Sequence, residues 1–340
     1  MSRTTQGDDR DQLLADVSEM YYEEGMTQQH IAHSVGVTRS AISRMLSEAR
    51  RKGIIEIHIR RPLRFDRALE AALARRFGLQ SAHVVSWRRE DYDGLRRYLG
   101  LAASRVLRDM LTPSTTLGLT WGTTVTATVD ALEGMNARVG KVVQLVGALG
   151  ARAVSYDARA LVHRLADGLG GEAVYLSAPF VVESAELAHC LKENASIQEA
   201  LEIGRHCDIV LVGVGSSMPD YSSLYLGGHI TLKELDELRE AGAVGDACGL
   251  HYGIDGEPLA SEFHERLVGI SREDLLSVPI RVGIGGGRAK VEALLGALRG
   301  GYMNILITNS LTATEILQLD SARNGNYAPA ATGQRKGGNN

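Results

Sequence analysis

Apolar residues near the amino terminus recur at helical spacing in three successive segments. The first predicts a helix at residues 11–24, and residues 1–10, which lack this spacing, are expected to be disordered. The second helix follows Thr27, whose hydroxyl can cap it, and ends at Gly36, which permits a tight turn. In the third segment the apolar residues fall at i, i+3, i+4 and i+7, and they are Ile42, Met45, Leu46 and Ala49. The order of these segments predicts a helix-turn-helix motif.

The opposite face of the third helix carries short polar and cationic side chains. They are Arg39, Ser40, Ser43 and Arg44. Such a face suits a helix in the major groove of double-stranded DNA, where an arginine can form two hydrogen bonds with a guanine. We therefore expect these four residues to read base edges. The residues expected to contact the DNA backbone lie at the starts of the two helices, and they are Thr27, Gln28 and Thr38.

The distribution of charge favours the same interpretation. Residues 38–61 contain seven lysines and arginines and two glutamates, a net charge of +5, whereas the whole chain carries −4. A positive surface confined to one segment is typical of a protein that binds the phosphate backbone. The alternative is an ordinary helical hairpin whose arginines only face solvent.

The segment after the third helix predicts a strand and then a domain boundary. Residues 54–59 are expected to form a strand, which would make the motif a winged variant with Arg60 and Arg61 near the DNA backbone. Pro62 cannot donate a hydrogen bond to a neighbouring strand, so we place the end of the DNA-binding domain, residues 1–62, at this position. An amphipathic helix is expected next, at residues 66–77.

From residue 81 the pattern changes to short apolar runs that alternate with helical periods. Strands are expected at residues 82–86, 116–120, 142–146, 173–176, 209–214, 279–284 and 304–308. Helices are expected at residues 94–110, 124–133, 157–168, 184–203, 231–241, 288–298 and 311–319. This alternation predicts an α/β fold over residues 63–320, with a largely parallel sheet and helices on both faces. Residues 321–340, which are rich in Asn, Gly and Ala, are expected to form a disordered tail.

Three strand-to-helix turns of this second domain combine glycines with polar or cationic side chains. They contain Gly122, Thr123 and Thr124, then Gly286 and Lys290, and finally residues 213–217. In a parallel sheet such turns lie at one edge, where free N–H groups at a helix start can bind an anion. None matches a P-loop or a dinucleotide-binding fingerprint, and each alone could be an ordinary tight turn. Together they predict one pocket for a small anion such as a phosphate, and we expect no cofactor and no metal.

Three further polar residues are candidate effector ligands. Asp255 could accept hydrogen bonds from sugar hydroxyls, or it could be an exposed turn residue before Gly256. Gln144 is a polar residue in an otherwise apolar strand. Lys141 could pair with a phosphate or form a Schiff base with an open-chain sugar, and the alternative is an exposed lysine at the start of a strand.

Composition bears on the location of the protein. Residues 1–12 are polar and acidic, unlike a signal peptide, and no run of 18 apolar residues is available to span a membrane. The cysteines Cys190, Cys207 and Cys248 are far apart and lack the spacing of a zinc site. We therefore expect a cytoplasmic protein that does not associate with a membrane.

Taken together, these motifs resemble the SorC family of bacterial transcriptional regulators. The resemblance covers about residues 12–320 and is carried by residues 21–29, 42–46, 53–55, 245–249, 286–290 and 306–313. It implies an amino-terminal DNA-binding domain and a Rossmann-type effector domain related to sugar-phosphate isomerases. It also implies a phosphorylated sugar as effector and a homotetramer or dimer of dimers. By motif, the resemblance places Gly122, Thr123 and Thr124 at the phosphate, Lys290 beside it and Asp255 at the sugar.

The sequence supports two functional hypotheses and leaves a non-catalytic scaffold as a third. The first is a transcriptional regulator of a carbohydrate-catabolism operon, which binds a DNA operator, carries out no reaction and is controlled by a sugar, a polyol or, by preference, a phosphorylated sugar. The second is a sugar-phosphate isomerase or deaminase with a helical appendage, because a fold does not fix a function. The basic helix, which an isomerase does not need, favours the regulator.

Overall fold

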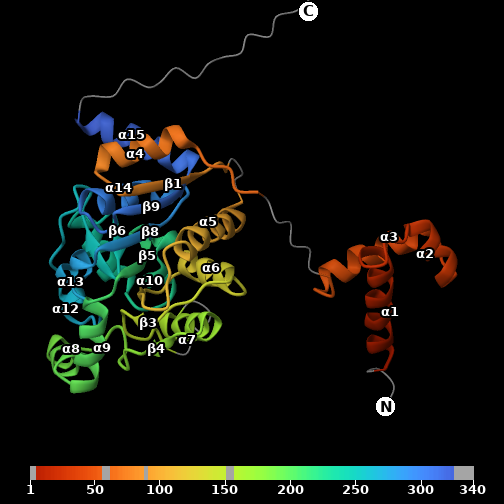
Figure 1. Cartoon of the computed structure of the whole chain (residues 1–340), viewed down its shortest axis with the longest axis horizontal. Helices are drawn as coiled ribbons and strands as arrows, with labels where there is room; N and C mark the ends of the chain where they lie inside the picture. Colours follow the sequence, from red (N-terminus) through yellow and green to blue (C-terminus); the bar gives the residue numbers. More distant parts are fainter. Residues whose placement is uncertain (1–4, 56–61, 88–90, 151–156, 325–340) are drawn as a thin grey trace, which may run out of the picture. The chain divides into compact units, whose positions relative to one another are not determined.

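The computed structural model describes residues 5–55, 62–87, 91–150 and 157–324 (Figure 1). Contacts between residues divide the chain into two units, residues 1–62 and residues 63–340. Within the described ranges, no helix is both long enough and apolar enough to cross a membrane.

The described part of the amino-terminal unit consists of α1 (Thr5–Tyr22), α2 (Gln28–Val35) and α3 (Arg39–Arg51). These helices enclose a small apolar core. Its buried side chains are Leu14, Val17, Ile31, Ala32, Ile42, Met45, Leu46 and Ala49. The inward face predicted for α3 is therefore confirmed.

The start of α1 corrects one expectation. Residues 5–10 are helical rather than disordered, because α1 already begins at Thr5. Ion pairs fasten this part of the helix to the end of α3. Arg10 Nη2 lies 2.8 Å from Glu48 Oε2, and Lys52 Nζ lies 2.5 Å from Asp11 Oδ1. These partners are distant in the sequence, so a local pattern could not reveal them.

Both predicted caps of the helix-turn-helix motif are present. Thr27 Oγ1 accepts a hydrogen bond from the N–H of His30 at 3.3 Å, and Thr38 Oγ1 accepts one from the N–H of Ala41 at 3.2 Å. Gly36 ends α2 with a φ of 74°, a left-handed conformation that favours glycine. The tight turn between the two helices is therefore built as the sequence predicted.

The strand expected at residues 54–59 falls mostly outside the described residues. Ile54 and Ile55, which are described, do not belong to a strand. Arg60 and Arg61, which were expected near the DNA backbone, also lie outside the described residues.

The carboxyl-terminal unit is built on a nine-stranded sheet (Figure 1). Seven strands are parallel and follow the order β1-β9-β8-β5-β2-β3-β4. The strands are β1 (Ser81–Val85), β2 (Thr116–Leu119), β3 (Lys141–Gln144), β4 (Glu172–Val174), β5 (Ile209–Ser216), β6 (Gly245–Ala247), β7 (Leu250–Tyr252), β8 (Ile280–Ile284) and β9 (Ile305–Asn309). Each strand expected from residue 81 onward overlaps one of these, so the predicted parallel α/β fold is confirmed.

The hairpin formed by β6 and β7 is not predicted by the sequence pattern. Its strands have three residues each and run antiparallel to one another, and β6 pairs with the carboxyl-terminal end of β5. An alternating pattern cannot be recognised over so few residues. The hairpin nevertheless matters for the site, because its register places Asp246 opposite Gly215.

Helices cover both faces of the sheet. They are α4 (Arg67–Phe77), α5 (Tyr92–Arg108), α6 (Thr123–Leu132), α7 (Ala158–Leu169), α8 (Ala185–Lys192), α9 (Ala195–Arg205), α10 (Ser223–Leu226), α11 (Leu232–Glu240), α12 (Glu262–Glu265), α13 (Arg272–Ser277), α14 (Val291–Arg299) and α15 (Ser310–Asn324), with short 3-10 helices at Pro219–Tyr221 and Arg288–Lys290. Alternate residues of β5 face opposite cores: Ile209 and Leu211 pack with α5, α6 and α7, whereas Val210 and Val212 pack with α4, α11, α14 and α15.

Two expected segments differ from the structure. The single helix predicted at residues 184–203 is two helices, α8 and α9, because Asn194 caps a new helix by accepting a hydrogen bond from the N–H of Ser196 at 3.1 Å. The tail expected from residue 321 is helical up to Asn324, and residues 325–340 lie outside the described residues.

Candidate DNA interface and effector site

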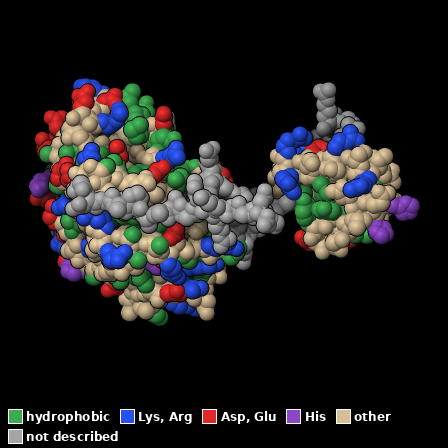
Figure 2. Space-filling view, turned by 90° about the horizontal axis from the view of Figure 1, so that it is seen from above, with side chains coloured by type: hydrophobic (Ala, Val, Ile, Leu, Met, Phe, Trp, Pro, Cys, Tyr) green, Lys and Arg blue, Asp and Glu red, His purple; other side chains and the backbone are tan. Residues whose placement is uncertain are grey.

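Helix α3 presents the side chains predicted to bind DNA on one exposed face. Arg39, Ser40, Ser43 and Arg44 are exposed, as are the caps Thr27 and Thr38, while Gln28 is half-buried. Figure 2 shows basic side chains spread over the visible surface of this unit. Thr38 and the four residues predicted to read base edges therefore lie at the start of α3 and on its exposed side, whereas Thr27 and Gln28 lie at the start of α2.

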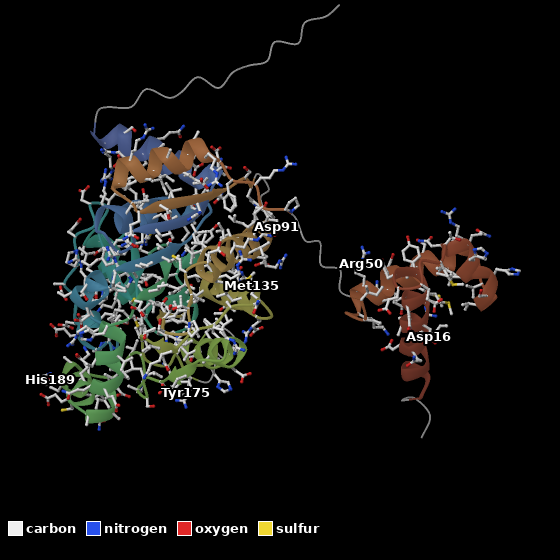
Figure 3. All side chains as sticks on the ribbon, viewed as in Figure 1. Asp16, Arg50, Asp91, Met135, Tyr175 and His189 are labelled. Carbon is white, nitrogen blue, oxygen red and sulfur yellow. The ribbon has the colours of Figure 1, made fainter. Side chains whose placement is uncertain are left out.

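The basic residues of α3 differ in their partners. Arg50, which is labelled in Figure 3, donates a hydrogen bond to the hydroxyl of Tyr22 at 2.9 Å and so ties α3 to α1. None of the ion pairs among residues 5–55 involves Arg39 or Arg44. Arg44 Nε donates a hydrogen bond to the carbonyl of Ser40 at 3.4 Å, and both guanidinium groups are exposed and not neutralised by a carboxylate of residues 5–55.

In the carboxyl-terminal unit, a cavity lies where β2, β5 and β8 end. Its volume is about 40 Å³. It is lined by Tyr92, Thr120, Trp121, Gly122, Thr123, Thr124, Gly213, Val214, Gly215, Ser223, Asp246, Cys248, Gly285, Gly286 and Lys290. All three glycine-containing turns contribute, so the structure joins them at one edge of the sheet, as the parallel topology requires.

The amino-terminal end of α6 opens into this cavity. Gly122 is the capping residue, has a φ of 136° and has no side chain to bond to the first N–H groups of the helix. The first turn of an α-helix has N–H groups without partners inside the helix, and its dipole favours a negative charge. Thr123 and Thr124 add hydroxyl groups beside these N–H groups. The arrangement suits an anion.

Two buried ionisable groups, Asp246 and Lys290, line the same cavity. Lys290 Nζ donates a hydrogen bond to the carbonyl of Val214 at 2.8 Å, and Asp246 Oδ2 accepts one from the N–H of Gly249 at 3.2 Å. Burial lowers the pKa of Lys290 to about 8 and raises the pKa of Asp246, while their mutual attraction opposes both shifts. None of the ion pairs found among the described residues joins these two groups, although each lines the cavity.

Asp246 is a site residue that was not predicted from the sequence. It belongs to one of the motifs that carry the family resemblance, and a second signal was the glycine at position 215. A Cβ atom on Gly215 would lie 1.7 Å from Asp246 Oδ1. Gly215 is therefore needed to make room for a buried carboxylate that is distant in the sequence, a relationship that only the strand register reveals.

The turn at Gly286 is held in place by the start of α15. The N–H of Gly287 donates to Thr312 Oγ1 at 2.8 Å, and Thr312 Oγ1 in turn lies 2.7 Å from Asn309 Oδ1. A Cβ on Gly286 would approach Asn309 Oδ1 to 2.6 Å. Glycine is thus required at position 286 for close packing beside the cavity, rather than for a left-handed backbone.

Lys141 does not join the site, and its assignment to the effector is corrected. It begins β3, opposite Thr116 at the start of β2, whereas the cavity lies at the other end of these strands. Its Nζ lies 3.1 Å from Glu172 Oε2. The alternative of an exposed lysine at the start of a strand describes it.

Asp255 and Gln144 also lie outside the cavity lining. Asp255 follows β7 in a turn, is largely exposed and pairs with Arg299, so the alternative of an exposed turn residue describes it. Gln144 ends β3 and is 1% exposed, and its Nε2 donates to the carbonyl of Val146 at 2.8 Å. Its Oε1 has no hydrogen-bond partner among the described residues.

Searches for related proteins agree with the two-unit architecture. A family model for a sugar-binding domain matches residues 61–318, and a model for a Crp-like helix-turn-helix domain matches residues 12–68. Transcriptional regulator LsrR of Escherichia coli (strain K12) is 30% identical over 318 residues, which cover 92% of this chain and 96% of LsrR. The deoxyribonucleoside regulator of Bacillus subtilis (strain 168) is 27% identical over 309 residues, or 91% of this chain and 98% of that protein.

A solved structure agrees with the fold of the chain. The full-length sorbitol operon regulator SorC from Klebsiella pneumoniae matches with a TM-score of 0.70 and 27% identity, over 90% of this chain and 98% of that one. The chain therefore belongs to the SorC family of transcriptional regulators, in which a helix-turn-helix domain is combined with a sugar-binding domain.

Proposed function

We propose that the carboxyl-terminal unit binds a phosphorylated sugar in the cavity at the ends of β2, β5 and β8, and that binding changes the affinity of α3 for a DNA operator. One observation carries this proposal: the uncapped start of α6 opens into the same cavity as the buried side chains of Asp246 and Lys290. The regulated genes would be those of a carbohydrate-catabolism operon.

The cavity offers different chemistry to the two ends of such an effector. The free N–H groups of α6 and the hydroxyls of Thr123 and Thr124 would hold the phosphate. Asp246 can accept hydrogen bonds from sugar hydroxyls, and Lys290 can donate to them. A free sugar or a polyol would use only the second set of contacts, so we expect it to bind more weakly.

The small volume of the cavity implies movement on binding. A cavity of about 40 Å³ has space for only a few water molecules, so side chains at its mouth must move to admit a sugar phosphate. Tyr92 lines this mouth and is 40% exposed, so its ring can turn outward into solvent. An effector that binds such a rearranged state would shift the population of conformations and thereby change the affinity of the protein for DNA.

For the DNA complex we propose that Arg39, Ser40, Ser43 and Arg44 of α3 contact base edges. Thr27, Gln28 and Thr38 would contact the phosphate backbone. We propose that the protein acts in the cytoplasm as a homo-oligomer, either a tetramer or a dimer of dimers. A symmetric oligomer needs a nearly palindromic operator, with half-sites separated by about one helical turn of DNA or a multiple of it.

The thermal unfolding of the full-length protein provides the first test. We expect a panel of pentose and hexose monophosphates to contain at least one compound that raises the Tm, while its free sugar raises it less at equal concentration. Fluorescence anisotropy with DNA from upstream of the gene then measures whether the same compound changes operator affinity. The proposal would be abandoned if no sugar phosphate changed either the Tm or the affinity for DNA.

The same compounds test the alternative hypothesis that the protein is an enzyme. Incubation of the stabilising sugar phosphate with the protein, followed by separation of the products, would reveal an isomerase or deaminase. We expect the compound to be recovered unchanged, and turnover at an enzymatic rate would favour the enzyme.

A further inference from the structure

A groove separate from the effector cavity lies between α9 and the segment at residues 267–274, which includes the start of α13. Its volume is about 880 Å³, within the range of about 300–1,000 Å³ that is usual for small-molecule sites. Its floor is apolar and is formed by Phe180, Cys248, Leu250, Leu267 and Ile270. The elements that frame it, α8, α9, α12 and α13, lie at one end of this unit in Figure 1.

The rim of the groove is charged, and three of its charged side chains are joined by ion pairs. Arg205 pairs with Glu202 at 2.7 Å and with Asp274 at 2.9 Å. Arg272 places its guanidinium over the ring of Tyr302, 5.3 Å from the centroid, and donates to the hydroxyl of that tyrosine. Two acidic residues, Glu199 and Glu273, also line the rim. The anionic group of a ligand would therefore have to lie beside a cationic side chain and apart from these two carboxylates.

Lys192 at the end of α8 supplies such a cation. Its side chain is half-buried, and burial lowers its pKa. No carboxylate lies within ion-pair distance of its Nζ among the described residues. A partly desolvated ammonium group without a counter-charge is stabilised by an anion, so the charge at this point of the rim is complementary to a negatively charged group.

The groove and the effector cavity share one wall, the turn at residues 246–249. Cys248 lines both spaces. It has a φ of 58°, an uncommon conformation for a residue other than glycine. A Cβ on Gly249 would lie 2.5 Å from the ring of Phe180, and the N–H of Gly249 holds the Asp246 carboxylate. A ligand that moves Phe180 or Cys248 therefore acts directly on Asp246.

We propose that this groove is a second ligand site, for a small amphipathic molecule with an apolar body and one anionic group, and that it is coupled to the effector cavity through the turn at residues 246–249. The apolar body packs on Phe180, Leu267 and Ile270. The anionic group lies beside Lys192. By linkage, the second ligand and the effector change each other's affinity by the same factor.

The test uses 8-anilino-1-naphthalenesulfonate, which has an apolar body and one anionic group, and needs neither DNA nor a sugar phosphate. We expect saturable fluorescence enhancement of the full-length protein with a stoichiometry of one per chain. Lys192→Glu should weaken binding at least tenfold, and Gln198→Trp, which fills the groove, should weaken it similarly. The matched control is Lys233→Glu, which removes an exposed lysine on α11, 87% accessible, and should leave binding unchanged.

The coupling is measured with Asp246→Asn, which should change the affinity for the probe at least threefold. An unchanged affinity of Asp246→Asn for the probe would contradict the coupling. Wild-type affinity for the probe in both Lys192→Glu and Gln198→Trp would contradict the site. The Tm of each variant identifies any variant that fails to fold. A change of oligomeric state in Lys192→Glu, measured by analytical ultracentrifugation, would assign the groove to a second copy of the chain and overturn the proposal.

Discussion

Arg299 Nη2 lies 2.7 Å from Asp320 Oδ1, and the same carboxylate accepts a hydrogen bond from Arg76. Asp320 is 1% exposed, so one buried carboxylate joins α14, α15 and α4. Burial by itself would raise the pKa of Asp320, but the two arginines outweigh burial and hold this pKa below its usual range. The cluster fastens α4, the first helix after residue 62, to one face of the sheet.

Asp320→Asn should therefore destabilise the carboxyl-terminal unit. Breaking a buried ion pair costs about 3–5 kcal/mol, and we expect about 3 kcal/mol because Arg76 remains partly solvated. Because the pKa of Asp320 is depressed on folding, its contribution is present above the pKa of the unfolded carboxyl group and is lost as the pH falls through the folded pKa. Urea unfolding from pH 7 down to about pH 2, well below the usual Asp pKa of about 3.9, measures both effects. The difference in unfolding free energy between the variant and the wild type should narrow only below about pH 4.

The control for this variant is Asp255→Asn. Asp255 pairs with the same Arg299, but 72% of its side chain is exposed. An exposed pair contributes roughly 0–1 kcal/mol. If Asp320→Asn and Asp255→Asn lowered the free energy of unfolding by the same amount, this would contradict the role given to the buried carboxylate.

Gly215→Ala should abolish the response to the effector while DNA binding persists. The new methyl group would occupy the space of the Asp246 carboxylate, 1.7 Å from Oδ1, and would displace it from the cavity. We expect the affinity for the stabilising sugar phosphate to fall at least tenfold, measured by calorimetry. The matched control is Gly168→Ala in α7, where the nearest atom to a new Cβ lies 4.0 Å away. If Gly215→Ala bound the effector with the affinity of the wild type, the sugar would have to bind at a different place in the protein.

The affinity for the effector should depend on pH through Lys290, whose pKa is lowered to about 8 by burial. The protonated side chain favours an anionic ligand, so affinity should decrease as the pH rises through 8 and beyond. A bound anion raises the pKa of Lys290, which places the midpoint at or above this value. Titrations from pH 6.5 to pH 9.5 measure the dependence.

Lys290→Met keeps an unbranched side chain, one atom shorter than that of lysine, and removes its charge. This variant should bind the effector weakly and should lose the pH dependence above pH 7. If the effector affinity of Lys290→Met still decreased with pH as much as that of the wild type, the titrating group would be a residue other than Lys290.

Arg44→Ala should weaken operator binding more than tenfold and leave the stabilisation by sugar phosphate unchanged. Arg44→Lys separates charge from geometry, because lysine cannot form the two parallel hydrogen bonds that arginine makes with guanine. We expect the lysine variant to retain binding to nonspecific DNA and to lose specificity, measured by anisotropy with operator and scrambled duplexes. Loss of both DNA binding and effector stabilisation would mean that Arg44 has a structural role.

The elements with a clear period were predictable. The apolar stripe of α3 at Ile42, Met45 and Leu46 is buried as its spacing required, and Thr27 and Thr38 cap their helices. The three glycine-containing turns meet at one edge because parallel strands all end there. The local sequence sets the helix periods and the caps, whereas the meeting of the turns follows from the parallel topology that the alternation of strands and helices predicts.

Residues whose environment is made by distant segments were not predictable. Asp246 faces the cavity only because β6 pairs with the end of β5, and Lys141 misses it only because it begins its strand rather than ends it. The sequence by itself determined the helix-turn-helix motif, the parallel sheet and the edge at which a ligand site can form. The tertiary structure decided which side chains reach that site, because burial and charge pairing depend on strand register and on contacts between residues far apart in the chain.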